Sequence, residues 1–213
     1  MIKFETIVLG DLETNCYIVW DEETKQCLII DPADDGIAVS EEIQARSLKP
    51  IGVLVTHGHF DHIMGALDLK LIYKIPFYCN SKDEFLLGRQ SKTASHFLKR
   101  KTDVPNFQKI DIDLDQIEKI NLGDEILQII KTPGHTPGSL CLYNKKGGLL
   151  FSGDTLFEQS IGRTDLAGGN FETIIHSIKN ELFILPEETR VFPGHGSETS
   201  IKDEKKYNPF LKN

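Results

Sequence analysis

The stretch Ile51-Gly52-Val53-Leu54-Val55-Thr56-His57-Gly58-His59-Phe60-Asp61-His62 decides how the chain is organised. Its first six residues are apolar and rich in β-branched side chains, which predicts a strand buried on both faces. Its last six residues hold three of the seven histidines in the chain, together with an aspartate. Side chains alternate along an extended segment, so we expect positions 57, 59 and 61 on one side, joined by His62 if the chain turns there.

Three further apolar runs end in a similar way, at residues 127–134, 149–153 and 190–194. Each passes through a Pro-Gly or Ser-Gly turn and then delivers a polar residue. Active sites often lie on strand-end loops held by a rigid scaffold, so we expect these ends to meet at one edge of the sheets. The candidate metal ligands are His57, His59, Asp61, His62, His135, Asp154 and His195.

This candidate set is too large for one tetrahedral ion and suits two. Imidazole and carboxylate groups bind zinc, iron or manganese, and three imidazoles plus a water make a catalytic zinc site. We therefore predict two divalent metal ions, with Zn²⁺ first and Fe or Mn as alternatives. His96 and His176 stand alone in polar or helix-like stretches and are left out of the site.

The rest of the chain predicts more strands than helices, and the helices come singly. The predicted strands are 2–10, 15–20, 27–31, 51–56, 76–79, 125–131, 140–144, 149–152 and 190–192, and the predicted helices are 36–48, part of 63–73, a start at 82–87, and 171–182 with Asn170 as N-cap. This order favours an α+β architecture within the α/β class, a sandwich of two mixed sheets with helices on the outer faces. We expect one domain over residues 1–213. Residues 88–107 are polar without a clean period and are expected to form a mobile excursion or an entrance loop.

Composition excludes several classes of protein. Lys and Arg number 24 against 32 Asp and Glu, and the resulting charge of −8 disfavours nucleic-acid binding. No apolar run approaches the roughly 18 residues of a membrane helix, and the N-terminus lacks a signal-peptide core. The four cysteines are scattered and fit buried free thiols. We expect a soluble cytoplasmic protein with a small-molecule substrate, no nucleic-acid partner and no membrane; the sequence does not fix its oligomeric state.

The motifs resemble those of the metallo-β-lactamase superfamily. Thr56-His57-Gly58-His59-Phe60-Asp61-His62 resembles its T-H-x-H-x-D-H motif, and the later motifs follow in the same order as Thr132-Pro133-Gly134-His135-Thr136-Pro137-Gly138-Ser139, Ser152-Gly153-Asp154-Thr155 and Pro193-Gly194-His195-Gly196. The resemblance runs from the first strands to Asn208-Pro209-Phe210-Leu211 and implies an αββα sandwich with a dinuclear site between the sheets.

By this resemblance, each candidate ligand has an expected place. His57, His59 and His135 would hold one metal; Asp61, His62 and His195 would hold the second, and Asp154 would bridge them. The segment Ile161-Gly162-Arg163-Thr164-Asp165-Leu166-Ala167-Gly168-Gly169 is similar to that of small glyoxalase-II-like hydrolases. Only 18 residues follow His195, so we expect no counterpart of the C-terminal helical region that helps glyoxalase II bind glutathione.

The resemblance implies a metal-dependent thioesterase of the hydroxyacylglutathione-hydrolase type. A metal-bridging hydroxide would attack the thioester carbonyl, since a metal lowers the pKa of bound water to about 7. Asp61 would orient that hydroxide, and a metal would stabilise the leaving thiolate. Arg163 and Asp165 are candidate substrate-binding residues at the entrance, or else a pair that fixes the Gly-rich loop.

Other functions stay open beside this one. His57, His135 and Asp154 form the two-histidine, one-carboxylate set of non-haem iron enzymes, and persulfide dioxygenases of the same superfamily also carry a G-R-T-D segment. A lactone or other ester hydrolase is a further alternative. A non-catalytic binding module is disfavoured because every ligand position is filled. Nuclease activity is disfavoured by the charge, and β-lactam hydrolysis by the missing export signal.

Overall fold

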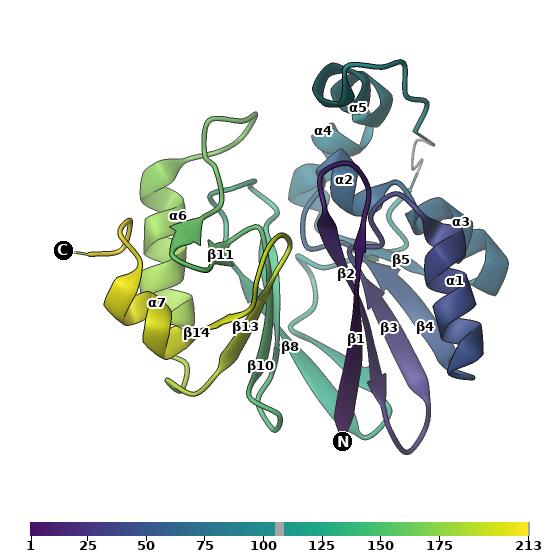
Figure 1. Ribbon diagram of the computed structural model, residues 1–213, viewed down its shortest axis with the longest axis horizontal. Helices are drawn as coiled ribbons and strands as arrows, with labels where there is room; N and C mark the ends of the chain where they lie inside the picture. The colour runs from purple at the N-terminus through teal and green to yellow at the C-terminus, as the bar shows by residue number, and fades with distance from the viewer. Residues whose placement is uncertain (105–108, 213) are drawn as a thin grey trace.

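Two mixed β-sheets pack face to face, with helices on both outer surfaces (Figure 1). The computed structural model describes residues 1–104 and 109–212. The first sheet has the order β1-β2-β3-β4-β5-β6, formed by Ile2–Leu9, Thr14–Asp21, Gln26–Ile30, Lys49–Leu54, Phe77–Cys79 and Ile112–Asp113. Its first three strands are antiparallel, and β3 to β6 run parallel.

The second sheet has the order β14-β13-β10-β9-β8-β7. These strands are β7 (Lys119–Leu122), β8 (Glu125–Lys131), β9 (Leu140–Asn144), β10 (Leu149–Gly153), β13 (Arg190–Pro193) and β14 (Thr199–Ser200). Only the β10–β13 pair is parallel within this sheet. A small hairpin, β11 (Leu156–Phe157) and β12 (Ser160–Ile161), follows β10.

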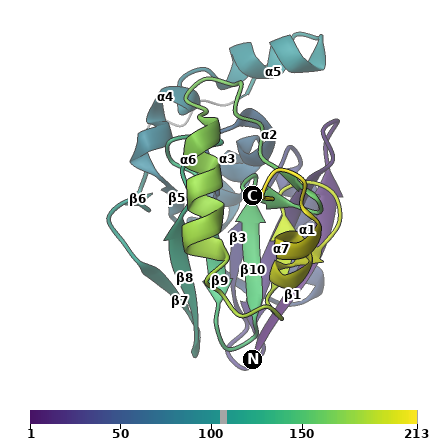
Figure 2. The same ribbon diagram turned by 90° about the vertical axis from the view of Figure 1, so that its left-hand side faces the viewer.

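Helices cover the outer face of each sheet. Beside the first sheet lie α1 (Gly36–Ala45) and α3 (Ala66–Tyr73), and over the second lie α6 (Phe171–Ser177), a π-helical continuation η2 (Ile178–Leu182) and α7 (Ile201–Tyr207) (Figures 1 and 2). The short elements α2 (Phe60–Ile63), η1 (Ser81–Asp83) and α4 (Glu84–Leu87) and the helix α5 (Gln90–Leu98) lie near one end of the sandwich. Every helix in the two described ranges is too short or too polar to span a membrane.

Alternating apolar side chains explain the four layers. On β2, Tyr17 and Val19 enter the core between the sheets, whereas Cys16 and Ile18 pack under α1 and α3. On β10, Leu150 packs toward α6, while its neighbours on both sides face the other sheet. A strand with apolar residues on both faces can be buried on both, which accounts for the continuous apolar runs in the sequence. The predicted αββα sandwich is confirmed.

Several predicted boundaries need correction. The strand predicted over 51–56 is β4 and runs from Lys49 to Leu54, so Thr56 already belongs to the loop that carries His57 and His59. The segment expected to form an entrance loop over 88–107 contains α5, a nine-residue helix, and residues 105–108 lie outside the described part. Its buried residues, Gln90 and Ala94, are spaced by four, but polar side chains hide that helical period. The predicted helix at 171–182 is correct, including its cap: Asn170 accepts a hydrogen bond from the Thr173 backbone.

Candidate metal centre

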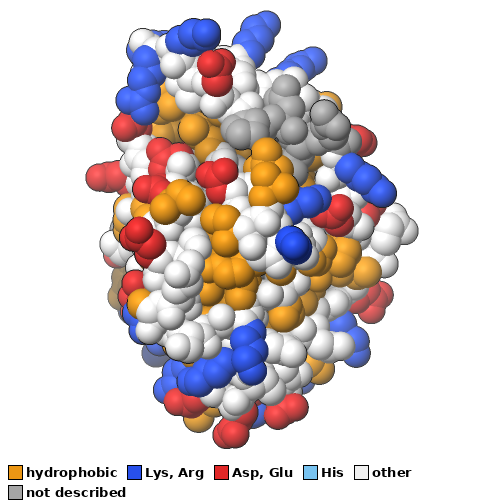
Figure 3. All heavy atoms as spheres, turned by 90° about the vertical axis from the view of Figure 1, so that its right-hand side faces the viewer, with side chains coloured by type: hydrophobic (Ala, Val, Ile, Leu, Met, Phe, Trp, Pro, Cys, Tyr) orange, Lys and Arg blue, Asp and Glu red, His pale blue; other side chains and the backbone are white. Residues whose placement is uncertain are grey.

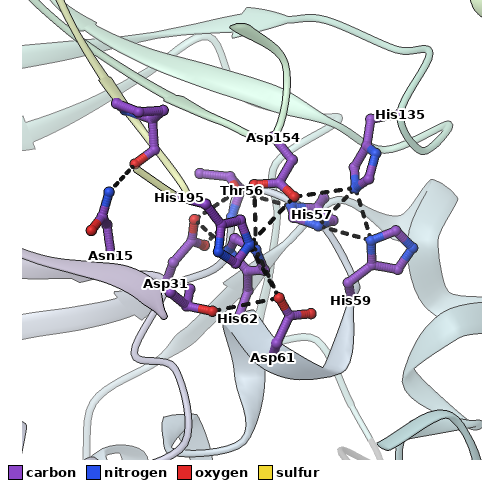
Figure 4. A network of polar contacts seen from close by, with 12 residues as sticks. Asn15, Asp31, Thr56, His57, His59, Asp61, His62, His135, Asp154 and His195 are labelled. Atoms are coloured by element: carbon purple, nitrogen blue, oxygen red, sulfur yellow. Dashed lines mark hydrogen bonds and ion pairs between the residues drawn. The ribbon is translucent and has the colours of Figure 1, made fainter. Parts of the chain in front are cut away.

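All seven predicted ligands converge at the ends of strands from both sheets (Figure 4). His57 and His59 follow β4, His135 follows β8, Asp154 follows β10 and His195 follows β13. Asp61 and His62 lie on α2, so the expectation that positions 57, 59 and 61 share one extended segment is wrong for Asp61. The chain turns into α2 directly after His59, and that turn carries both residues toward the other ligands.

The first group of donors consists of three imidazoles. His57 Nε2 lies 3.0 Å from His59 Nδ1, and His135 Nε2 lies 3.2 Å and 2.8 Å from these two atoms. All three histidines are at least nine-tenths buried. Three ring nitrogens that face one common point form a set suited to a single cation.

The second group combines two imidazoles with a carboxylate. Asp61 Oδ2 lies 3.3 Å from His195 Nε2 and 3.5 Å from His62 Nε2, and the two ring nitrogens are 3.3 Å apart. His62 is fully buried, whereas a quarter of the His195 side chain is exposed. This group therefore lies nearer to solvent than the first.

Asp154 lies between the two groups. Its Oδ2 is 3.6 Å from His135 Nε2 and equally 3.6 Å from His195 Nε2, and its Oδ1 is 3.4 Å from His62 Nε2. Gly194 makes room for this arrangement, because a Cβ there would collide with the Asp154 carboxylate and lie 2.7 Å from the His62 ring. One carboxylate therefore faces both groups at once.

Hydrogen bonds on the outer ring nitrogens set the protonation of the inner ones. His135 Nδ1 lies 2.7 Å from the Arg163 carbonyl, and His195 Nδ1 lies 2.9 Å from the Leu12 carbonyl. A carbonyl can only accept, so each Nδ1 carries a proton, and in the neutral ring each Nε2 presents a lone pair inward. Lone pairs that face one another this closely repel unless a cation lies among them, so the donors fit metal ions.

Asp31 lies beside two more histidines, and it acts on one of them through Thr56. Its Oδ2 accepts a hydrogen bond from Thr56 Oγ1 at 2.7 Å and lies 3.1 Å from His62 Nδ1. Because the Thr56 hydroxyl proton is directed to Asp31, its oxygen accepts from His57 Nδ1 at 3.1 Å. The neutral His57 ring therefore also turns an unprotonated Nε2 toward the centre. The rule of an apolar strand followed by a polar residue points to Asp31, but our sequence reasoning did not apply it there.

Two histidines in each group of donors have shifted pKa values, and the shifts have opposite directions in the two groups. Burial lowers the pKa of His57 and lowers that of His59 to about 4, so both rings are held neutral. Burial opposes charge on His62 and His195 too, but the nearby carboxylates of Asp154 and Asp61 outweigh it and raise both pKa values. A cation bound within the second group would compete with the protons that these raised pKa values favour.

Asp83 is a buried residue near the centre that the sequence did not reveal. Its Oδ2 accepts hydrogen bonds from Gly58 N at 2.8 Å and from Thr136 Oγ1 at 2.7 Å, and its Oδ1 accepts from Gly138 N at 2.7 Å. These partners flank His57, His59 and His135. The sequence around Asp83 reads only as a helix start, and nothing in it indicates a partner more than 50 residues away.

A cavity of about 800 Å³ opens beside the two groups of ligands. His59, His135, Asp154 and His195 line its floor, and residues of α5 and of the 162–169 loop line its walls. Arg163 lies on this wall, but its guanidinium donates to both carboxylate oxygens of Asp165, at 2.9 Å and 2.8 Å. The cavity gives a small organic molecule access to the centre.

Comparison with known proteins agrees with this geometry. The family model described as "Metallo-beta-lactamase superfamily" matches residues 9–195. The chain is 39% identical to the probable metallo-hydrolase YqgX of Bacillus subtilis, over 99% of this chain and 98% of the relative. It is 34% identical to the hydroxyacylglutathione hydrolase GloC of Haemophilus influenzae, with the same two coverages.

Solved structures give the same result. The BLEG-1 B3 metallo-beta-lactamase superposes with a TM-score of 0.91 at 36% identity, covering 99% of this chain and 100% of that one. TTHA1623, solved in a di-iron-bound form, has a TM-score of 0.86 at 33% identity, covering 97% of this chain and 100% of that one. The chain is a metallo-hydrolase and belongs to the metallo-beta-lactamase superfamily.

Proposed function

We propose that this protein is a dinuclear thioesterase that hydrolyses hydroxyacyl thioesters such as a hydroxyacyl-glutathione. The observation that carries the proposal is the position of Asp154, whose Oδ2 lies 3.6 Å from a ring nitrogen of each donor group. His57, His59 and His135 would hold one ion; Asp61, His62 and His195 would hold the other, and Asp154 would bridge them. Zn²⁺ is the ion we propose, with Fe or Mn as alternatives.

Two bound ions would lower the pKa of a coordinated water to about 7 and polarise the substrate carbonyl. A side chain of the protein would orient the attacking water. Asp61 uses Oδ2 toward His62 and His195, while its Oδ1 has no hydrogen bond or ion pair with residues 1–104 or 109–212. That free oxygen can hold the proton of the attacking water and so direct its lone pair toward the carbonyl. Asp61 is thus the proposed catalytic residue.

A thioester fits this centre better than an amide. A thiolate leaves without a proton, whereas an amine needs one, and the groups on the cavity floor are ones that would bind metal. The walls contain apolar side chains such as Phe60, Leu86 and Phe97, and also Arg163. We propose that Arg163 and its ion-pair partner Asp165 lie at the substrate's entrance. The GloC relative supports the same substrate class.

The same set of ligands leaves a second function to be tested. His57, His135 and Asp154 alone could hold one iron, as in a persulfide dioxygenase, and the di-iron form of TTHA1623 is an observation that favours iron in a related centre. A lactone or other ester, or the β-lactam suggested by the BLEG-1 structure, would use the two-metal centre with another leaving group.

One experiment separates these functions. The metal content per chain is measured, and the same preparation is assayed with S-lactoylglutathione, a lactone, a chromogenic cephalosporin, and glutathione persulfide with oxygen uptake. We expect two metals per chain and hydrolysis of the thioester. One iron with oxygen consumption and no hydrolysis would replace the proposal with the dioxygenase. Two metals with turnover only of the lactone or the cephalosporin would keep the centre and refute the thioesterase.

A matched pair of variants shows whether the activity belongs to this centre. His135→Ala removes a proposed ligand, and we expect it to lose metal and turnover together. His176→Ala changes an exposed histidine whose side chain contacts Asn180, and we expect it to keep both. Equal loss in the two variants would assign the effect to general destabilisation.

We also propose that the protein works in the cytoplasm as a single domain over residues 1–213. The four cysteines are free and buried, which suits a reducing compartment. The core between the sheets draws on residues from both halves of the chain, such as Tyr17 and Phe151, so neither half would bury its apolar face alone.

A further inference from the structure

Two arginines line the wall of the cavity, and they differ in their partners. Arg163 is bound through two nitrogen atoms to Asp165. Arg89 is exposed, and its guanidinium makes no ion pair or hydrogen bond with any residue in 1–104 or 109–212. An arginine without a carboxylate partner keeps its full capacity to bind a planar anion through two parallel hydrogen bonds.

Arg89 belongs to a basic segment in an acidic protein. Residues 88–104 contain five lysines and arginines against one aspartate, although the whole chain carries a charge of −8. Figure 3 shows Lys and Arg side chains gathered at the end of the molecule where α5 lies. The net charge of the protein repels anions, so a local cationic wall is needed to draw an anionic substrate into the cavity.

The basic face of α5 continues outward from the cavity. A neighbouring hollow of about 630 Å³ is lined by Lys92 and His96 and shares Arg89, Thr93 and Phe97 with the cavity. These positions are spaced by three or four residues, so they form one face of the helix. A substrate held at the metal ligands can therefore extend past Arg89 toward Lys92, with its apolar part against Phe97.

The acidic residue of the cavity that is not a proposed metal ligand lies apart from α5. Asp61 and Asp154 are proposed metal ligands, and Glu158 lies in the β11–β12 turn of the second-sheet half (Figure 1). An anionic group of a substrate avoids Glu158 and is attracted to the α5 wall. Arg89 and the acidic Glu158 would together orient the bound substrate, with its anionic group toward α5.

We propose that Arg89 is a specificity-determining residue that binds an anionic group, a carboxylate or a phosphate, on the thiol portion of the substrate. The inference rests on the proposed thioesterase function, because it assigns the α5 end of the cavity to the leaving thiol. The wall of the cavity that α5 forms would then recognise the anionic thiol. Lys92 extends the same cationic face for a longer anionic tail.

The test measures binding separately from turnover. The metal-loaded protein is titrated calorimetrically with S-methylglutathione, a thioether that cannot be hydrolysed, with its diethyl ester, and with S-methyl-coenzyme A. The variant is Arg89→Gln, and the matched control is Arg100→Gln, which removes the same charge from the same segment at a residue that pairs with Asp11.

We expect Arg89→Gln to weaken the binding of one acidic thioether, S-methylglutathione or S-methyl-coenzyme A, about fivefold more than it weakens the binding of the diethyl ester. The quantity compared is the ratio of the acidic thioether's affinity to that of the diethyl ester. A change of about fivefold is the size expected of a partly exposed charged hydrogen bond. Arg100→Gln should leave this ratio at its wild-type value. The wild-type affinity should fall with added salt more steeply than that of Arg89→Gln. Loss with S-methylglutathione identifies a carboxylate, and loss with S-methyl-coenzyme A identifies a phosphate.

Three results would overturn the inference: an unchanged ratio in Arg89→Gln, an equal loss in Arg100→Gln, or no binding of either acidic thioether to the wild-type protein. Turnover of the corresponding hydroxyacyl thioesters in the same preparation judges the proposed function on its own. If wild-type protein binds the thioethers but hydrolyses no thioester, the thioesterase proposal fails while the role of Arg89 in anion binding stands.

Discussion

The carboxylate of Asp83 accepts a hydrogen bond from the backbone nitrogen of Gly58 at 2.8 Å, between the two histidines that begin the metal-ligand loop. The same carboxylate holds Thr136 and Gly138, which follow His135. One buried side chain therefore ties together the two loops that supply the first group of imidazoles. Burial raises the pKa of Asp83, and hydrogen bonds from Thr136 and from both glycines counteract that shift.

Replacing Asp83 with asparagine should weaken the first metal site. An amide offers one oxygen, so one of the three hydrogen bonds is lost and a buried N–H is left facing an NH₂ group. We expect a loss of about 1–3 kcal/mol in the free energy of unfolding and about tenfold weaker binding of the first metal. Competitive chelator titration measures the affinity, and denaturant unfolding measures the stability.

The exposed Asp103 provides the matched control for this change. Asp103→Asn alters the charge equally, and we expect it to change neither quantity. The two proposed metal sites supply an internal comparison, because the loops tied by Asp83 carry the first group of donors and not Asp61 or His195. Equal weakening of both sites would contradict a specific role in positioning.

Removing the metals should cost both activity and stability. The proposed ligands come from loops of both sheets, so bound ions join the two halves of the sandwich, and binding to the folded state alone stabilises it. We expect chelation to lower the melting temperature by about 5–10 °C, since a free metal concentration a hundredfold above Kd contributes about 2.7 kcal/mol. Calorimetry before and after adding Zn²⁺ back measures this, and an unchanged melting temperature would argue against ions between the sheets.

Exchanging Asp61 for asparagine should reduce turnover. The amide keeps an oxygen of similar size but loses the negative charge that orients the attacking water, and we expect kcat to fall about a hundredfold or more. Steady-state kinetics with S-lactoylglutathione measure the change, and metal analysis shows how much of it reflects loss of the second ion. An unchanged rate with unchanged metal content would eliminate Asp61 as the catalytic residue.

Asp165→Asn should release Arg163 toward the cavity. The guanidinium of Arg163 lowers the pKa of Asp165 from 3.8 to about 2. The carboxylate is therefore ionised and paired at every pH above about 4, and the pair breaks only as the pH falls toward about 2. We expect the variant to lower KM for a carboxylate-bearing thioester about twofold to fivefold, by the same factor from pH 5 to pH 8.

The outcome of this exchange separates the two readings of the pair. A lower melting temperature with an unchanged KM would make Arg163 and Asp165 a device that fixes the 162–169 loop. An effect that grows as the pH rises through 7 would require a titrating group other than Asp165.

Local pattern was enough to predict most of the fold. The apolar runs gave the positions of β4, β8, β9, β10 and β13, and Asn170 marked the start of α6, because strand burial and helix capping depend on neighbours in sequence. Strands of two residues, such as β6 and β14, are too short to show a period. The helix α5 was missed because only one narrow face is buried and the rest is polar.

By itself, the sequence determined the seven candidate ligands and their grouping at strand ends, since the type of each side chain and the strand before it are local properties. Only the tertiary structure decided which atoms meet. It placed Asp61 on a helix, oriented three histidine rings through hydrogen bonds to Arg163, Leu12 and Thr56, set Asp31 beside a fourth, and brought Asp83 under two loops. The contacts of His135 and His195 join residues 28 and 183 positions apart, and Asp83 reaches residues more than 50 positions away, so they arise only when distant parts of the chain pack together.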